Sequence, residues 1–302
     1  MYFLALVLAQ TAAGASASAA RPAECGLGDS ADAGNVWERA KEPNLRRYCD
    51  LLASGTAKLV GAATLAAEVL DIADEADKLL PGRAAPLVLK GRALLVLEKA
   101  PDARAALLEA RKRDERALDD PMAMLSWARA SARTGHTDDA VAAYRAALPR
   151  ASALALADRS AAAFEAGATL VSTGTKGLDD GIAMLRLARR EAQDTLQLAS
   201  IIALALALDR SGQTDEATAV LAARVQGDVR RVLADKRVAD VLKNANLSHE
   251  LHAMTAFALE GVDAAGAKAA WARYLEGPGG KGPWAAHART REAAAGRKGR
   301  GR

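Results

Sequence analysis

The chain has 302 residues, enough for one elongated domain or two compact ones. Its apolar residues, 51% of the total, are mainly Ala and Leu, and aromatic residues make up 4%. The net charge of +4 is concentrated in residues 281–302, which hold seven Lys or Arg and one Glu, so the body of the chain is not basic. Strong helix formers, few β-branched residues and no sustained period-2 alternation argue against a β-sheet fold and indicate an all-α protein.

Residues 1–20 are typical of a signal peptide. The segment from Tyr2 to Ala9 is apolar, and the small residues from Ala15 to Ala19 suit a signal peptidase. The apolar run is shorter than the roughly 20 residues that a membrane span needs, and no Lys or Arg precedes it. We therefore expect a mature protein that is periplasmic or secreted, without a transmembrane segment. The alternative is a cytoplasmic protein whose N-terminus is an ordinary helix.

Residues 21–44 are expected to form an N-terminal arm. The cysteines of the chain, Cys25 and Cys49, lie in and just after it. In an oxidising compartment they can pair and attach the arm to the first helices, but two cysteines leave free thiols equally open.

Two nearly identical heptads, "TGHTDDA" at 134–140 and "SGQTDEA" at 211–217, indicate an internal repeat. The Ala that closes each heptad follows a small residue by twelve positions and precedes a large residue by four. The same template recurs along the chain, with an interval of fourteen in one copy. The five registers are Gly91–Ala103–Leu107, Ala128–Ala140–Tyr144, Gly167–Gly181–Leu185, Ala205–Ala217–Leu221 and Thr255–Ala267–Trp271.

Each unit is predicted to be two helices joined by a tight turn. Gly135 and Gly212 can take the left-handed conformation that ends the first helix. Thr137 and Thr214 can then cap the second helix, and the acidic residues after them favour its first turn. The small residues allow the two helices to approach closely, and the large residue fills the groove between them.

This pattern resembles the tetratricopeptide repeat, whose motif runs W-x2-L-G-x2-Y, then A-x3-F, then P. The resemblance covers roughly residues 45–276 and implies a right-handed α-solenoid of about five to six antiparallel helix pairs. The period here exceeds 34 residues, and most aromatic positions hold Leu or Ala. Residues 225–247 fit no repeat and are expected to be an inserted helical linker. The motif positions are matched by Met124, Trp127, Ala128, Ser131, Ala140 and Tyr144, by Ile201, Leu204, Ala205, Leu208, Ala217 and Leu221, and by Leu87, Lys90, Gly91, Leu94, Ala103, Leu107 and Ala110.

No motif for catalysis, metal binding or a cofactor competes with the repeat. The stretch "SHELH" places His249 and His252 three residues apart, whereas the zinc motif H-E-x-x-H needs four, and no further ligand follows. The stretch "GPGGKGP" at 277–283 lacks the Ser or Thr and the preceding strand of a phosphate loop. We therefore expect no catalytic residues, no metal, no cofactor and no small-molecule substrate.

Four arginines are the candidate binding residues. The first helices of such units commonly line a concave face that takes peptides, as the resemblance implies. Arg92 and Arg129 each follow the small residue of their first helix, and Arg133 and Arg210 each lie two residues before the turn glycine. A column of arginines suits carboxylates of a peptide terminus or an acidic strand. The competing interpretation is ordinary surface arginine favoured by the helix dipole.

Residues 277–302 are expected to form a basic, largely disordered tail, with a helix around Trp284 that could cap the last pair. The leading hypothesis is a non-enzymatic scaffold that binds partner proteins or peptides in the bacterial cell envelope. The alternative is a cytoplasmic helical-repeat regulator, or an adaptor that binds nucleic acid or another polyanion through the tail. A hydrolase or transferase ranks third. Nucleic acid is disfavoured as a partner if the protein is exported.

Overall fold

The structure of the protein is a computed structural model that describes residues 22–26, 43–61, 63–222, 229–244 and 246–298. The expected signal peptide and most of the N-terminal arm lie outside these residues. The described part consists of helices, loops and turns, without a strand. None of its helices combines the length and apolar character that crossing a membrane requires.

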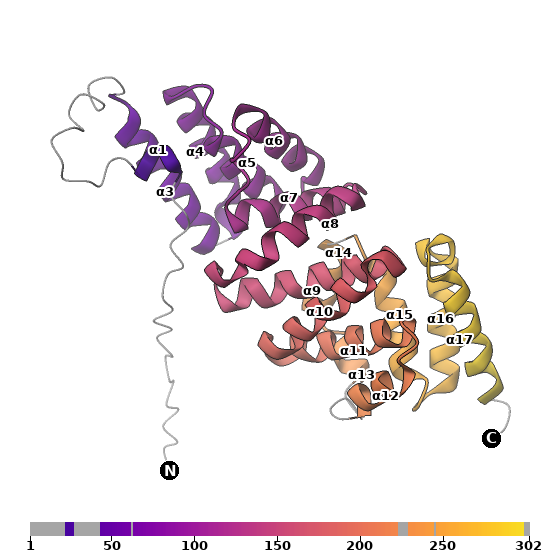
Figure 1. Ribbon diagram of the computed structural model, residues 1–302. Helices are drawn as coiled ribbons and strands as arrows, with labels where there is room; N and C mark the ends of the chain where they lie inside the picture. Colours follow the sequence, from indigo (N-terminus) through magenta and orange to yellow (C-terminus); the bar gives the residue numbers. More distant parts are fainter. Residues whose placement is uncertain (1–21, 27–42, 62, 223–228, 245, 299–302) are drawn as a thin grey trace, which may run out of the picture.

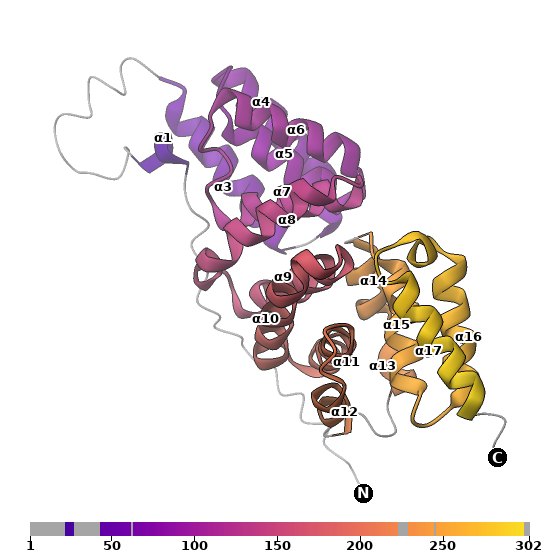
Figure 2. The ribbon, with the colours of Figure 1, turned by 45° about the vertical axis from the view of Figure 1, so that its right-hand side comes forward.

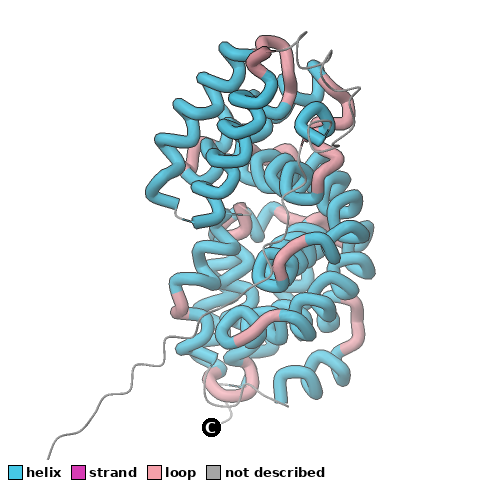
Figure 3. The backbone as a smooth tube through the Cα atoms, turned by 90° about the vertical axis from the view of Figure 1, so that its left-hand side faces the viewer, coloured by secondary structure: helices cyan, strands magenta, loops and turns pink. Residues whose placement is uncertain are grey.

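Within the described residues, six antiparallel helix pairs stack along the molecule, which confirms the all-α helical-repeat architecture (Figures 1 and 3). We call the first helix of each pair the A-helix and the second the B-helix. The pairs are α3 (Leu45–Gly61) with α4 (Ala66–Leu79), α5 (Ala85–Val96) with α6 (Ala100–Arg113), α7 (Pro121–Arg133) with α8 (Thr137–Ala147), α9 (Leu156–Ser172) with α10 (Thr175–Glu191), α11 (Asp194–Arg210) with α12 (Thr214–Ala222), and α15 (Ser248–Leu259) with α16 (Ala264–Glu276).

The remaining elements lie between the pairs or at their ends. Short 3-10 helices precede α4 and follow α8 and α16. The N-terminal helix α1 packs against α3, and α17 packs against α16. The bounds are α1 (Ala23–Gly26), η1 (Ala63–Leu65), η2 (Leu148–Ala153), α13 (Val229–Leu233), α14 (Lys236–Asn244), η3 (Pro278–Lys281) and α17 (Ala285–Lys298).

Small residues on the A-helix meet a large residue of the B-helix, as the repeat pattern predicts. A Cβ atom added to Gly91 would lie 2.6 Å from Cγ of Leu107, and one added to Gly167 would lie 2.6 Å from Cγ of Leu185. These two glycines therefore let neighbouring helices approach more closely than any side chain would allow. The closing alanines Ala103, Ala140, Ala217 and Ala267 are all fully buried.

The turn glycines take the predicted left-handed conformation. The φ angle is +78° at Gly135 and +82° at Gly212. At the first turn the amide of His136 donates to the carbonyl of Ser131 at 2.8 Å, and the second turn repeats this bond. Two amides thus satisfy carbonyl groups that the end of the A-helix leaves free.

The predicted threonine caps are wrong. Thr137 and Thr214 are the first residues of α8 and α12, one position inside the helix. The residue before α8, His136, makes no side-chain capping bond, and Thr214 Oγ1 instead donates to Asp209 Oδ1 at 3.2 Å. The turn is one residue shorter than a threonine cap requires, because the Gly-based end of the A-helix leads directly into the B-helix.

Adjacent B-helices are joined by a series of ion pairs. Arg104 on α6 pairs with Asp139 on α8 at 2.7 Å, and Arg186 on α10 pairs with Glu216 on α12 at 2.9 Å. Between them, Arg145 on α8 pairs with Asp180 on α10 at 2.6 Å. Each acidic partner immediately precedes the small closing residue of its unit. The pairs therefore follow the repeat register and mark the B-helices as a contiguous outer layer.

The buried apolar residues of the described segments form three clusters that succeed each other along the stack. Helix α9 bridges the second and the third, because Ala162 and Ala166 belong to one and Ala163 and Phe164 to the other. Helices α3 to α8 therefore form one half of the molecule and α9 to α17 the other (Figure 2).

The N-terminal helix α1 is attached to α3 by a disulfide. The structure joins Cys25 to Cys49 with their Cα atoms 5.7 Å apart. The hydroxyl of Tyr48 also donates to Glu24 Oε1 at 2.9 Å, and burial raises the pKa of this tyrosine, with the Glu24 carboxylate adding to the shift. A covalent and a polar link thus hold the short helix in place.

The C-terminal tail is expected from its sequence to be largely disordered, but within residues 278–298 it forms η3 and α17. Trp284 and Ala288 are buried, and the indole Nε1 of Trp284 donates to the carbonyl of Val171 at 2.6 Å. Apolar residues spaced along the basic segment therefore pack against the stack and order it. The glycine and arginine content alone predicts disorder, because it does not show this packing.

Candidate functional site

The candidate site is the inner face of the stack, on the side of the A-helices away from the B-helices. On α5, Val88, Arg92 and Val96 follow each other at intervals of four and share one face of the helix. Val96 is 41% exposed, while Val88 and Arg92 are half-buried. On the neighbouring α7, Met122 is half-buried in the same core cluster as Val88. The face offers apolar side chains around a cation.

Arg129 on α7 is occupied by a carboxylate of its own chain. Its Nε donates to Glu165 Oε2 at 2.7 Å, and an Nη donates to the other carboxylate oxygen at 3.3 Å. Glu165 on α9 is 5% exposed. The attraction of this carboxylate raises the pKa of Arg129 against the opposing effect of burial. The bidentate pair therefore ties α7 to α9 rather than leaving a cation for a partner.

Arg133 also contacts its own chain. Its Nη1 donates to the carbonyl oxygen of Leu95 at 2.9 Å, near the end of α5. Burial lowers its pKa, and the Glu165 carboxylate acts in the opposite direction. The guanidinium thus adds a second hydrogen bond to a carbonyl at the C-terminal end of the preceding A-helix, which also accepts from the amide of Glu98.

Arg210 has a different environment from Arg133, although both lie two residues before a turn glycine. Its side chain is 1% exposed and pairs with Glu250 Oε2 on α15 at 3.0 Å. It also donates to the hydroxyl of Tyr274 at 3.3 Å and lies over the ring of Trp284, 5.1 Å from the centroid. Residues of α15, of α16 and of the segment before α17 thus enclose the guanidinium, so Arg210 is inside the protein and is not part of an arginine column on the inner face.

Of the four candidate arginines, Arg92 is the one whose side chain has no direct partner among the described residues. Among the described residues, none forms a hydrogen bond or an ion pair with its side chain, although Asp120 and Asp158 influence it from farther away. Burial lowers the pKa of Arg92, the two carboxylates raise it, and Arg129 lowers it. A partly desolvated guanidinium without a partner is a good site for an external carboxylate.

Helices α13 and α14 cover the inner face of the second half. Helix α14 contacts the A-helices α9, α11 and α15, and α13 contacts α11 and α15 (Figures 1 and 2). Sequence reasoning treats this stretch as a linker. The sequence feature that could have predicted a packed helix here is the helical spacing of Val238, Val241 and Leu242, which gives the segment an apolar side. The open part of the inner face is therefore formed by α5, α7 and the first half of α9.

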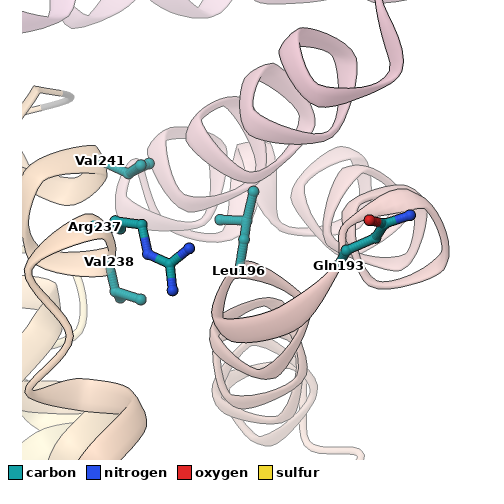
Figure 4. A pocket seen from close by; sticks show the side chains of 5 residues that line it. All are labelled: Gln193, Leu196, Arg237, Val238 and Val241. Atoms are coloured by element: carbon teal, nitrogen blue, oxygen red, sulfur yellow. The ribbon is translucent and has the colours of Figure 1, made fainter. Parts of the chain in front are cut away.

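A hollow of about 200 Å³ remains where α14 meets the start of α11. Leu196 and Gln193 line it on one side and Val238, Val241 and Arg237 on the other (Figure 4). Arg237 extends across it and donates to the hydroxyl of Thr195 at 2.8 Å. The described residues that line it include neither a nucleophile nor a carboxylate.

A second polar cluster, which sequence reasoning misses, joins α11 to α17. Asp209 accepts from His287 Nε2 at 2.8 Å and from Arg291 Nε at 3.0 Å. Arg291 also pairs with Glu260 at 3.4 Å, and Glu260 accepts from the indole of Trp271 at 2.9 Å. Burial would raise the pKa of Asp209, but the hydrogen bonds from His287 and Arg291 outweigh it and lower the pKa. This cluster holds the last helix in place.

The histidines of "SHELH" do not form a metal site. His249 Nε2 lies 3.6 Å from Glu250 Oε1, and that carboxylate also pairs with Arg210. Burial lowers the pKa of His252, and Arg273 adds to the effect. Across the described residues, no group of three or more His, Cys, Asp or Glu side chains is arranged to hold a metal ion.

Comparison with protein-family models finds no match, and comparison with curated protein sequences finds none either. Among solved structures, the chain is similar to the Rap conjugation gene regulator of the plasmid pLS20 in complex with the Phr* peptide. The identity is 16% over 89% of this chain and 79% of the regulator, with a TM-score of 0.38. This likeness is too low to carry an argument, so the candidate site rests on the residues of this chain.

Proposed function

We propose that the protein is a non-enzymatic scaffold that binds partner proteins or peptides on the open inner face formed by α5, α7 and the first half of α9. The observation that carries the proposal is Arg92, a partly buried cation that forms no hydrogen bond or ion pair with any residue of the described chain. Val88 and Val96 flank it at one helical turn on each side. A carboxylate on Arg92 with an apolar side chain beside it therefore matches the chemistry of this face.

We further propose that the scaffold works in the bacterial cell envelope after removal of residues 1–20. The Cys25–Cys49 disulfide supports this location, because such bonds persist in oxidising compartments. The small-residue pattern before Arg21 supports it independently.

One experiment tests both proposals. A C-terminally tagged chain is captured from the envelope fraction as wild type, as Arg92→Glu and as the charge-preserving Arg92→Lys. The matched control is Arg189→Glu, which reverses an exposed arginine on α10, away from the inner face. We expect Arg92→Glu to lose specific partners by at least about tenfold in amount, as when a charge-assisted hydrogen bond is replaced by repulsion. Arg92→Lys should keep most of them, and the Arg189→Glu control should keep them all.

Two outcomes contradict the proposals separately. Retention of every partner by Arg92→Glu would remove the inner-face site. The N-terminal sequence of the captured protein should begin near Arg21, and an uncleaved chain found in the cytosol would remove the envelope location.

A further inference from the structure

The inner face of the second half is covered by a segment that does not belong to the repeats. Helix α14 packs on α9, α11 and α15, which are the A-helices of three successive pairs. In the first half, by contrast, the A-helices α5 and α7 leave Arg92 and Val96 accessible. One continuous face is thus open at one end and occupied by the protein's own helix at the other.

Helix α14 is held mainly through its apolar side. Val238 and Leu242 are each 1% exposed, and they lie one helical turn apart. On the opposite side Lys236 and Lys243 are exposed. A hollow of about 200 Å³ lies in this interface, between Leu196 and Gln193 on one side and Val238 and Val241 on the other (Figure 4). An amphipathic helix that packs its apolar side on other helices in this way resembles a peptide helix bound to a protein surface.

The end of α14 reaches across to the first half of the molecule. Lys243 Nζ lies 3.6 Å from Glu98 Oε2, in the turn that follows α5. Glu98 occupies the place that Gly135 and Gly212 hold in the later turns, and its φ angle of +59° is also left-handed. Its amide donates to Leu95, as the turn glycines donate in their own units.

A glutamate at this position is conformationally unfavourable compared with glycine. Its side chain nevertheless places a carboxylate at the edge of the open face, opposite the last turn of α14. The unfavourable backbone conformation of Glu98 thus puts a charge at a contact between the two halves.

We propose that α13 and α14 form an internal occupant of the binding face, fastened to the first half by the Lys243–Glu98 pair, and that their release uncovers α9 and α11 for an amphipathic helix of a partner. This inference rests on the proposed function, because it extends the same face. It concerns the second half, however, and can be tested without knowing the partner.

The direct test is exchange of α14 with a copy supplied in trans. The probe is a fluorescent synthetic peptide of residues 234–247, added to the full chain as wild type and as Val238→Asp/Leu242→Asp. We expect the peptide to bind the double variant at least about tenfold more tightly than the wild type, because the tethered helix no longer competes at high effective concentration. A peptide that carries the same two aspartates is the control and should not bind. A double variant that keeps wild-type helicity but does not bind the peptide overturns the proposal.

Hydrogen exchange of the wild-type chain provides a test that needs no core substitution. Under native conditions the amides of α14 should exchange at least about tenfold faster than those of α11, because a releasable segment opens without global unfolding. Equal protection of the two helices overturns the proposal, whether or not the double variant folds.

Charge reversal tests the fastening pair. Lys243→Glu should speed exchange in α14 by about two- to fivefold, the range for an exposed ion pair, and adding Glu98→Lys should restore it. An unchanged rate in Lys243→Glu would show that the pair does not fasten α14. Because none of these measurements involves Arg92, they fail independently of the capture experiment.

Discussion

At the scale of single residues, whether an arginine can bind a partner depends on whether a carboxylate of the same chain already pairs with it. Arg129 and Arg210 meet buried glutamates from other helices, whereas Arg92 meets none. Sequence position brings Arg92 and Arg129 into equivalent places, but Glu165 has no counterpart in the register that precedes it. Charge reversal at Arg129 would place two carboxylates together inside the protein, so Arg92 is the appropriate residue for a binding test.

Glu165→Gln is expected to lower the free energy of unfolding by about 3 kcal/mol, because it leaves the guanidinium of Arg129 partly buried without a full counter-charge. The matched control is Asp180→Asn. It breaks the exposed pair with Arg145 and should cost less than about 1 kcal/mol. Urea denaturation followed by circular dichroism measures both. Equal costs would mean that the Arg129–Glu165 pair is no more important than a surface pair.

At the scale of elements, the turn between the helices of a pair is the most regular feature. Gly135 and Gly212 end their A-helices with the same two hydrogen bonds, and Glu98 ends α5 in the same way despite its side chain. The backbone geometry of the turn is therefore more constant than the residue that adopts it.

Substitutions at the equivalent turn positions 98 and 212 should change the free energy of unfolding in opposite directions. Gly212→Ala should destabilise the protein by about 1–2 kcal/mol, because alanine is strained at positive φ. Nothing lies within 4 Å of the added Cβ, so steric crowding does not contribute. Glu98→Gly should instead stabilise it by up to about 1 kcal/mol. Thermal unfolding of the two variants checks this, and a loss of stability in Glu98→Gly would show that the contacts of the glutamate side chain outweigh the backbone strain.

At the scale of the whole molecule, the C-terminal helix is joined to the stack by a buried polar cluster. Asp209, on the central helix α11, receives hydrogen bonds from His287 and Arg291 on α17. These contacts link residues about 80 positions apart. The ionised carboxylate of Asp209 therefore contributes to holding α17 against α11.

The lowered pKa of Asp209 predicts acid sensitivity. A carboxyl group whose pKa is lower in the folded than in the unfolded state stabilises the fold above about pH 4, and this contribution is lost as the pH falls through the folded-state pKa. Asp209→Asn should therefore be less stable at pH 7 and should lose less stability between pH 5 and about pH 2. Urea denaturation at each pH, followed by tryptophan fluorescence, measures the slopes. A slope in Asp209→Asn as steep as that of the wild type contradicts the prediction, and Asp180→Asn is the control.

The sequence by itself determined the units of this protein. Good helix formers, glycines at the turns and the small-to-large spacing act over a few residues, so Gly91 with Leu107 and the turn at Gly135 could be found without coordinates. These features are local because one helix pair is enough to satisfy them.

Only the tertiary structure decided which inner-face residues remain available. The pairing of Arg129 with Glu165, the burial of Arg210, the position of α14 and the docking of α17 through Asp209 join segments 36 to 82 residues apart. The repeat pattern carries no information on these contacts, because they depend on the direction and curvature of the stack. A charged side chain becomes a binding site or a structural ion pair according to what the stacked helices bring next to it.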